Sequence, residues 1–209
     1  FRRIYQSLKR NFQVIIPDLL GFGFSPRCAT NEYNPSKIIS YLIDLLKTLQ
    51  ITENLKIVGA SMGGSTALKL AFEIPDSIEK MILLSPAGLF GKPKSIPFPL
   101  NQIGASFLGL QQVRKSLCRQ AFAFPNECVG EMEEQIASIH LGCSGWRDSL
   151  ASFAKSGGFA GTQKYIQNIP IKTVCGENDR ILGKKEIKNI RNIEKLNFIE
   201  LQNCGHLPH

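Results

Sequence analysis

The sequence predicts an α/β fold, with a mostly parallel sheet and helices on both of its faces. Several runs of about six residues are apolar throughout, which is typical of strands buried on both sides. Between these runs, apolar residues recur at helical spacing, and glycine-rich turns follow the runs directly. Strands that alternate with helices form parallel βαβ units, whose ligand sites lie at the carboxyl ends of the strands. Functional residues are therefore expected at those ends.

The first part of the chain contains one predicted strand and one predicted helix. Residues 12–17, FQVIIP, are a continuous apolar run, and the glycine loop GFGFSP follows. Asn34 and Pro35 then supply an N-cap and a proline at the first helical position. An apolar stripe from Ile38 to Leu49 predicts an amphipathic helix.

The alternation of predicted strands and helices continues to residue 85, is interrupted there, and resumes near residue 166. Strands are predicted at residues 55–60 and 80–85, with a helix between them that ends before Pro75. From Pro86 to about Tyr165, prolines and then helical stripes at 107–117, 132–139 and 146–153 indicate a helical insertion. Strands at 171–176 and 197–202 flank a Lys-rich helix near 184–191. The predicted divisions are therefore a first core part (1–85), the insertion (86–165) and a second core part (166–209).

Composition excludes several classes of protein. With 209 residues and 43% hydrophobic content, the chain predicts a single domain with one core. It lacks a run of about 20 apolar residues, so no membrane span is predicted. The net charge of +8 is dispersed and not interleaved with aromatic residues, which argues against nucleic acid as a partner. A small-molecule substrate is expected instead, and nothing in the sequence suggests a metal or organic cofactor.

The cysteines suggest a reducing environment. Six are scattered along the chain without a CxxC pair or a metal-like spacing: Cys28, Cys118, Cys128, Cys143, Cys175 and Cys204. We interpret them as free thiols, mostly buried. This favours a cytoplasmic location, or the plastid stroma in a eukaryote.

The pattern G-x-S-x-G, centred on Ser61, is the first chemical signal. Alone it is only moderately specific, but here a buried strand enters it and a helix leaves it. A serine on such a sharp turn needs small neighbours, and Gly59 and Gly63 meet that need. The Met62 N–H would then point toward a developing oxyanion. An ordinary glycine-serine turn before a helix is the alternative.

A serine nucleophile requires a base and a carboxylate that orients the base. Of the three histidines, His206 follows the last predicted strand, His140 lies inside a helical stripe, and His209 is the final residue. His206 is therefore the predicted base. For the acid, Glu177 and Asp179 both follow the strand at 171–176, and position alone leaves both open.

Four segments together resemble successive signatures of the α/β-hydrolase superfamily: PDLLGFGFS, VGASMGGSTAL, CGENDRIL and NCGHLPH. The resemblance covers nearly the whole chain and implies a Ser61, Asp179 and His206 triad, with Asp179 rather than Glu177 as the acid. It also implies that the loop from Asp18 to Ser25 shapes the wall of the active site. The insertion resembles the cap of the family, which roofs the pocket. Candidate pocket residues are Phe107, Leu108, Met132, Trp146 and Phe153, with packing inside the cap as the alternative role.

The chain departs from the family pattern at its start. Family members carry an upstream strand and a His-Gly loop that donates the second oxyanion N–H, and the sequence begins after both. Because that strand would lie between residues 12–17 and 55–60, we expect residues 1–209 alone to fold poorly.

The function expected from the resemblance is hydrolysis of an ester, thioester, amide or C–C bond in a small, apolar substrate. Within the fold, epoxide hydrolases and dehalogenases use an aspartate nucleophile, which Ser61 argues against, whereas a cofactor-free peroxidase would keep the same triad. A ligand-binding receptor with a hydrolase pocket is the alternative from another class. A protein-interaction or nucleic-acid role is a third, and it rests on charge alone.

Overall fold

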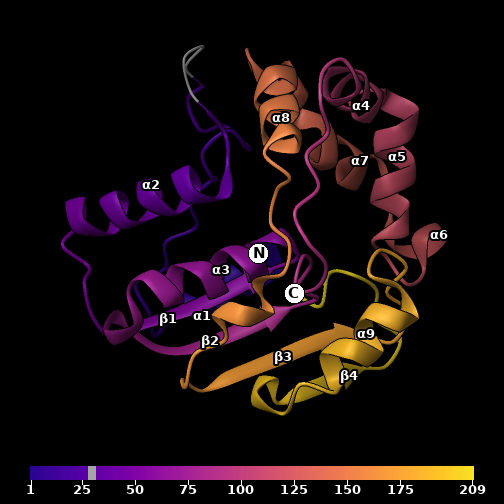
Figure 1. Ribbon diagram of the computed structural model, residues 1–209. Helices are drawn as coiled ribbons and strands as arrows, with labels where there is room; N and C mark the ends of the chain where they lie inside the picture. The colour runs from indigo at the N-terminus through magenta and orange to yellow at the C-terminus, as the bar shows by residue number, and fades with distance from the viewer. Residues whose placement is uncertain (28–31) are drawn as a thin grey trace.

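The computed structural model describes residues 1–27 and 32–209. Within these residues, four strands form one parallel sheet in the order β1-β2-β3-β4. The strands are β1 (Leu55–Ala60), β2 (Ile78–Leu84), β3 (Ile171–Gly176) and β4 (Phe198–Leu201). Because all four run in the same direction, their carboxyl ends meet at one edge of the sheet (Figure 1).

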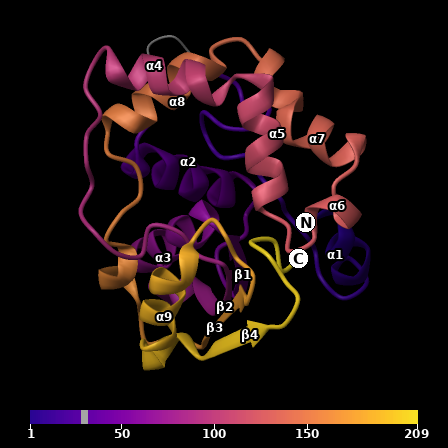
Figure 2. The same ribbon diagram turned by 90° about the vertical axis from the view of Figure 1, so that its right-hand side faces the viewer.

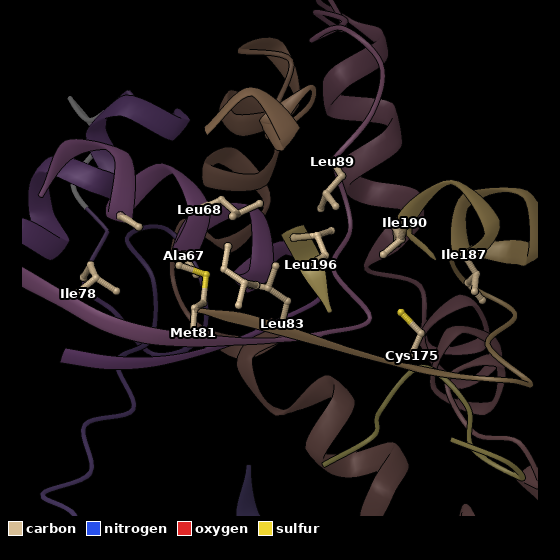
Figure 3. Close-up of a cluster of buried hydrophobic side chains, with 12 residues drawn as sticks. Ala67, Leu68, Ile78, Met81, Leu83, Leu89, Cys175, Ile187, Ile190 and Leu196 are labelled. Carbon is tan, nitrogen blue, oxygen red and sulfur yellow. The ribbon is translucent and has the colours of Figure 1, made fainter. Parts of the chain in front are cut away.

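Two helices cover one face of the sheet and form the main core with it. Ala67 and Leu68 of helix α3 and Ile187 and Ile190 of helix α9 are buried with β2 residues such as Met81 (Figure 3). Burial of each of the Leu, Ile and Met side chains contributes roughly 1.5–3 kcal/mol. The core therefore fixes both helices over the strands whose ends carry the candidate residues.

The helices of the described residues lie around this sheet. Their bounds are α1 (Arg2–Leu8), α2 (Pro35–Thr48), α3 (Met62–Glu73), α4 (Leu100–Leu108), α5 (Gln111–Gln120), α6 (Pro125–Cys128), α7 (Glu131–Ser138), α8 (Trp146–Lys155) and α9 (Gly183–Arg191). Short 3-10 helices lie at Pro75–Ser77, Ile139–Gly142, Thr162–Tyr165 and Glu194–Leu196. Helix α2 begins as predicted, because the Asn34 side chain accepts a hydrogen bond from the Lys37 N–H at 2.9 Å.

Helices α4 to α8 lie between β2 and β3 in the chain and pack largely on one another, away from the main core (Figure 1). In Figure 2, α5 runs from α4 down toward the loop that holds the C-terminal residues. The final residues also reach the start of the chain, since the rings of Phe1 and His209 stack at 4.6 Å.

The strand predicted at residues 12–17 is not present. The segment has no regular secondary structure, and Phe12, Ile15 and Ile16 are exposed. It passes near β1, since the Lys56 ammonium lies 6.0 Å from the Phe12 ring. Within the described residues it pairs with no strand, and an apolar run becomes a strand only where a neighbour accepts its hydrogen bonds.

Three smaller expectations also need correction. The stripe at 107–117 is not one helix, because α4 ends at Leu108 and α5 begins at Gln111. Helix α1 was not predicted at all. The five described cysteines are free, but only Cys175 is buried, and Cys28 lies outside the described residues.

No helix in the described part of the chain is long and apolar enough to cross a bilayer.

Candidate functional site

Ser61 stands on a strained turn between β1 and α3. Its backbone has φ 51° and ψ −120°, a conformation that residues other than glycine rarely adopt. Backbone hydrogen bonds hold it there: the Ser61 N–H donates to the Leu84 carbonyl at 2.9 Å, and the Ala87 N–H donates to the Ser61 carbonyl at 3.0 Å. The tertiary structure thus forces the Ser61 backbone into a conformation typical of functional turns.

The glycines around Ser61 have different steric roles. A Cβ on Gly59 would collide with the Gly63 carbonyl, so Gly59 is required at the turn, as predicted. A Cβ on Gly63 would meet nothing within 4 Å, contrary to our expectation. The tight position is instead Gly64, where a Cβ would lie 2.6 Å from Pro86 Cβ. Gly64 thus lets the start of α3 lie against the segment that follows β2.

Met62 is the first residue of α3, so its N–H points out of the helix end. Within residues 1–27 and 32–209, no hydrogen-bond acceptor is found for this N–H. An unoccupied donor at a helix N-terminus is suited to stabilise negative charge. This geometry is what an oxyanion donor next to Ser61 requires.

Asp179 and His206 form a buried pair. His206 Nδ1 lies 2.8 Å from Asp179 Oδ2, and both residues are at most 5% exposed. The other carboxylate oxygen, Oδ1, accepts hydrogen bonds from the N–H groups of Ile181 at 2.9 Å and Leu182 at 3.0 Å. With Asp179 ionised, Nδ1 is the nitrogen that carries the proton, which leaves Nε2 free to accept one.

The surroundings keep Asp179 ionised. Burial alone would raise the pKa of its carboxyl group. The hydrogen bond from His206, those from the Leu182 and Ile181 N–H groups, and the electrostatic interaction with His206 outweigh burial, so the net pKa of the carboxyl group lies below its usual value.

The loop that carries His206 packs closely between the end of β3 and the end of α5. The His206 N–H donates to the Ala121 carbonyl at 2.8 Å. A Cβ on Gly205 would collide with that same carbonyl, and a Cβ on Gly176 would collide with the Gly205 carbonyl. Two glycines thus allow the acid loop, the histidine loop and the helical insertion to meet.

Hydrogen bonds beyond the strand ends connect the loops of the site. Ser61 bonds to Leu84 at the end of β2, and the Ser85 N–H donates to Val174 of β3 at 2.8 Å. The loops of Ser61 and Asp179 are therefore two strand spacings apart, about 10 Å. No hydrogen bond joins the Ser61 hydroxyl to His206 among the described residues, so only the Asp179 and His206 part of the predicted triad is in direct contact.

The rival residues lie elsewhere. Glu177 is exposed, and among the described residues the hydrogen bond of His206 Nδ1 is made with Asp179 instead. His140 is half-buried, with its ring centroid 6.1 Å from that of Trp146, and burial lowers its pKa. His209 stacks on Phe1.

The predicted pocket residues have separate environments. Phe107 and Met132 are more than half exposed, and Met132 Sδ accepts a hydrogen bond from Arg2 at 2.9 Å. Trp146 is half-buried against Gly109. Phe153 packs edge to face on Phe22 of the glycine loop, with centroids 5.2 Å apart. Contact of these four with a substrate stays a prediction.

A hollow of about 270 Å³ lies between α2 and α3, away from the candidate residues. Its lining residues are Ser36, Ile39, Ser40, Ile43, Asp44, Lys47, Lys69 and Glu73. None of Ser61, Asp179 and His206 lines it, so we do not assign it to the site. In the described part of the chain, no group of His, Cys, Asp and Glu is arranged to hold a metal ion.

Sequence reasoning missed two features near the pair. One is the Ala121 carbonyl, which accepts a hydrogen bond from the His206 N–H. The glycine at position 205 is the sequence feature that could have indicated this close approach. The other is Glu186, half-buried in the first turn of α9. Burial and then the charge of Asp179 raise the pKa of Glu186, whereas His206 opposes the shift. The sequence pattern predicts the helix that contains Glu186, but it does not show that Glu186 lies near Asp179 in space.

Comparison with known proteins agrees with this architecture. A family model described as alpha/beta hydrolase fold matches residues 1–129. The alpha/beta hydrolase domain-containing protein VTE7 of Arabidopsis thaliana is 27% identical, covering 100% of this chain and 65% of the relative. A 2-hydroxymuconate semialdehyde hydrolase of Pseudomonas sp. (strain CF600) is 26% identical, covering 99% and 74%. Lipase 3 of Moraxella sp. (strain TA144) is 35% identical, covering 100% and 67%.

Solved structures share the fold. A meta-cleavage product hydrolase from Pseudomonas fluorescens IP01 superposes with a TM-score of 0.77 at 20% identity, covering 98% of this chain and 76% of that chain. A 2-hydroxy-6-oxo-6-phenylhexa-2,4-dienoate hydrolase from Rhodococcus sp. strain RHA1 superposes with a TM-score of 0.76 at 22% identity, covering 99% and 77%. The chain therefore spans about two thirds to three quarters of the length of these proteins.

Proposed function

Because the chain belongs to the α/β hydrolase fold family, we propose that the protein is a serine hydrolase with Ser61 as nucleophile, His206 as general base and Asp179 as orienting acid. The observation that carries the proposal is the buried Asp179 and His206 pair, 2.8 Å apart, at the same sheet edge as the strained Ser61 turn. Strained backbone is costly to stability, and buried, charge-coupled pairs such as Asp179 and His206 cluster at functional sites, so their coincidence favours a catalytic role.

In the proposed reaction, Ser61 Oγ attacks the carbonyl carbon of the substrate while His206 Nε2 takes its proton. The new C–O bond forms as the carbonyl π electrons move to oxygen. Collapse of this intermediate breaks the bond to the leaving group, which takes the proton from His206. Water then attacks the acyl-enzyme, with His206 as base, and releases the acid and free Ser61.

The Met62 N–H is the proposed oxyanion donor. It is the first N–H of α3, it directly follows the nucleophile, and it has no acceptor among the described residues. One such donor typically contributes about 2.7–4 kcal/mol to transition-state stabilisation.

The proposed substrate is a small, apolar molecule with an ester, thioester, amide or C–C bond next to a carbonyl. The relatives include a 2-hydroxymuconate semialdehyde hydrolase and a lipase. Because these two names denote different hydrolases, they support a proposal that leaves the type of bond open. We further propose that residues 86–165 act as a cap over the site, with 1–85 and 166–209 as the core. The bond from His206 to Ala121, at the end of α5, supports a cap that touches the catalytic loop.

A receptor that keeps the fold and turns substrate over slowly is the alternative from another class. A fluorophosphonate probe, which reacts with activated serines, separates the two in the full-length protein. The proposal predicts labelling that disappears in Ser61→Ala, falls strongly in His206→Ala, and persists in Ser116→Ala, a control at an exposed serine of α5. Absence of labelling in the wild type would favour the receptor.

The proposed compartment is a reducing one such as the cytoplasm. The described cysteines are all free, including the exposed Cys128, which supports this location.

A further inference from the structure

Helix α4 packs on α8 with the side that carries Asn101 and Ala105. Asn101 is buried, and its side-chain amide donates to the Ala151 carbonyl of α8 at 3.1 Å. Ala105, one turn along the same side, is also buried and small enough for close packing. These two residues fix which side of α4 faces the protein.

The opposite side of α4 exposes large apolar residues. Leu100, Ile103 and Phe107 follow helical spacing on α4. Phe98 precedes them in the exposed segment 91–100, and Leu110 follows them as the N-cap of α5. Their exposed fractions are 78% for Phe98, 59% for Leu100, 59% for Ile103, 56% for Phe107 and 55% for Leu110. We call these five residues the α4 apolar face. Single exposed apolar residues are ordinary, but five large ones within 13 positions of the chain, all more than half exposed, indicate an interaction site.

The charge around this face is basic. No Asp or Glu occurs between Glu79 and Glu127 in the sequence. Lys92 and Lys94 lie exposed just before the face, and Lys155 is near them because the Ser95 hydroxyl donates to its carbonyl at 2.6 Å. The nearby carboxylate of Asp148, 3.4 Å from the Gln102 amide, is paired with Arg147 at 3.6 Å.

We propose that the α4 apolar face binds the surface of an anionic lipid bilayer. Exposed Phe, Leu and Ile side chains beside lysines are the combination by which amphipathic helices insert at the boundary of headgroups and acyl chains. The lysines complement anionic headgroups, and the absence of acidic residues from 80–126 removes the charge that such a surface would repel. The inference does not depend on the proposed catalysis.

The test is co-sedimentation of the full chain with vesicles. One set is phosphatidylcholine alone, and the other is phosphatidylcholine and phosphatidylglycerol in equal parts. The wild type is expected to bind the mixed vesicles more tightly, and added salt is expected to weaken this binding. Phe98→Ser with Ile103→Ser is expected to weaken partitioning at least about tenfold on both sets.

Two further variants make the result specific. Tyr41→Ser with Leu49→Ser removes two apolar side chains of α2 and its C-cap that are also large and exposed, at 49% and 45%, and is expected to bind like the wild type. Lys92→Glu with Lys94→Glu keeps the apolar face and is expected to bind the mixed vesicles at least about thirtyfold more weakly, with binding to phosphatidylcholine unchanged. If Phe98→Ser with Ile103→Ser fails to fold, the lysine variant still tests the proposal, because it changes the charge beside the face and leaves the apolar side chains in place.

Three outcomes would overturn the proposal. The first is no binding of the wild type to the mixed vesicles. The second is equal weakening by the α2 control. The third is a wild-type dimer that becomes a monomer in Phe98→Ser with Ile103→Ser while neither protein binds vesicles, which would assign the face to a second copy of the chain.

Discussion

Replacing Ser61 by alanine and by glycine is expected to reverse the usual order of stability of these two residues. Both changes remove the hydroxyl, so both should abolish activity, and neither adds volume to the turn. They differ in how they tolerate the backbone of residue 61, at φ 51° and ψ −120°. This is the mirror image of an extended conformation, which glycine enters freely and alanine does not.

The size of the effect follows from two opposing terms. Alanine in this conformation carries a strain of about 1–3 kcal/mol. Glycine avoids the strain but loses about 0.5–1 kcal/mol more backbone entropy on folding. The glycine variant is therefore expected to be more stable than the alanine variant by about 1 kcal/mol, since the strain exceeds the entropic cost. At an ordinary helical position glycine would be about 1 kcal/mol less stable.

Urea unfolding of the full-length protein, followed by circular dichroism, measures the difference. A change of about 1 kcal/mol shifts the midpoint by roughly 0.5 M urea. Ser106, exposed within α4, is the matched control, where the alanine variant should be the more stable one. If alanine is the more stable residue at position 61 as well, the turn does not carry the strain that its backbone angles predict.

The acid, the turn and the pH dependence each give a further prediction. Asp179→Asn should lower kcat by about ten-thousand-fold because the wrong imidazole tautomer is favoured, whereas Glu177→Gln should have little effect; steady-state kinetics that show the reverse would make Glu177 the acid. Gly64→Ala should destabilise by about 1–3 kcal/mol because its Cβ meets Pro86, while Gly63→Ala should not, and equal melting temperatures would contradict this. Because the pKa of Asp179 is lowered by folding, its stabilisation is complete above its ordinary value of about 3.9 and is lost as the pH falls through the lower folded-state value. The part of the stability advantage of wild type over Asp179→Asn that comes from the carboxylate should therefore shrink as the pH falls below about 4, and urea titrations that find loss of this part on the alkaline side instead would be inconsistent with this sign.

Local patterns predicted most of the α/β core. The strand at 55–60 and the strand at 171–176 were predicted with their observed bounds, and the N-cap of α2 at Asn34 is confirmed. These features depend on residues close together in the chain, where apolar runs and capping side chains act directly. Residues 12–17 have the same apolar character but no strand, because a ladder needs a neighbour that local sequence does not supply.

For the candidate site, local patterns predict which residue types stand at strand ends: the serine turn after β1, the acidic residues Glu177 and Asp179 after β3, and His206 after β4. Packing in three dimensions is needed to show that Asp179 is the buried hydrogen-bond partner of His206 and that Glu177 is exposed. It also decided that Gly64, rather than Gly63, is the tight glycine of the turn, and that Ala121 anchors the histidine loop. The reason is physical: burial, steric contact and a hydrogen bond of 2.8 Å between residues 27 positions apart depend on how elements pack in space, and spacing along the chain carries no such information.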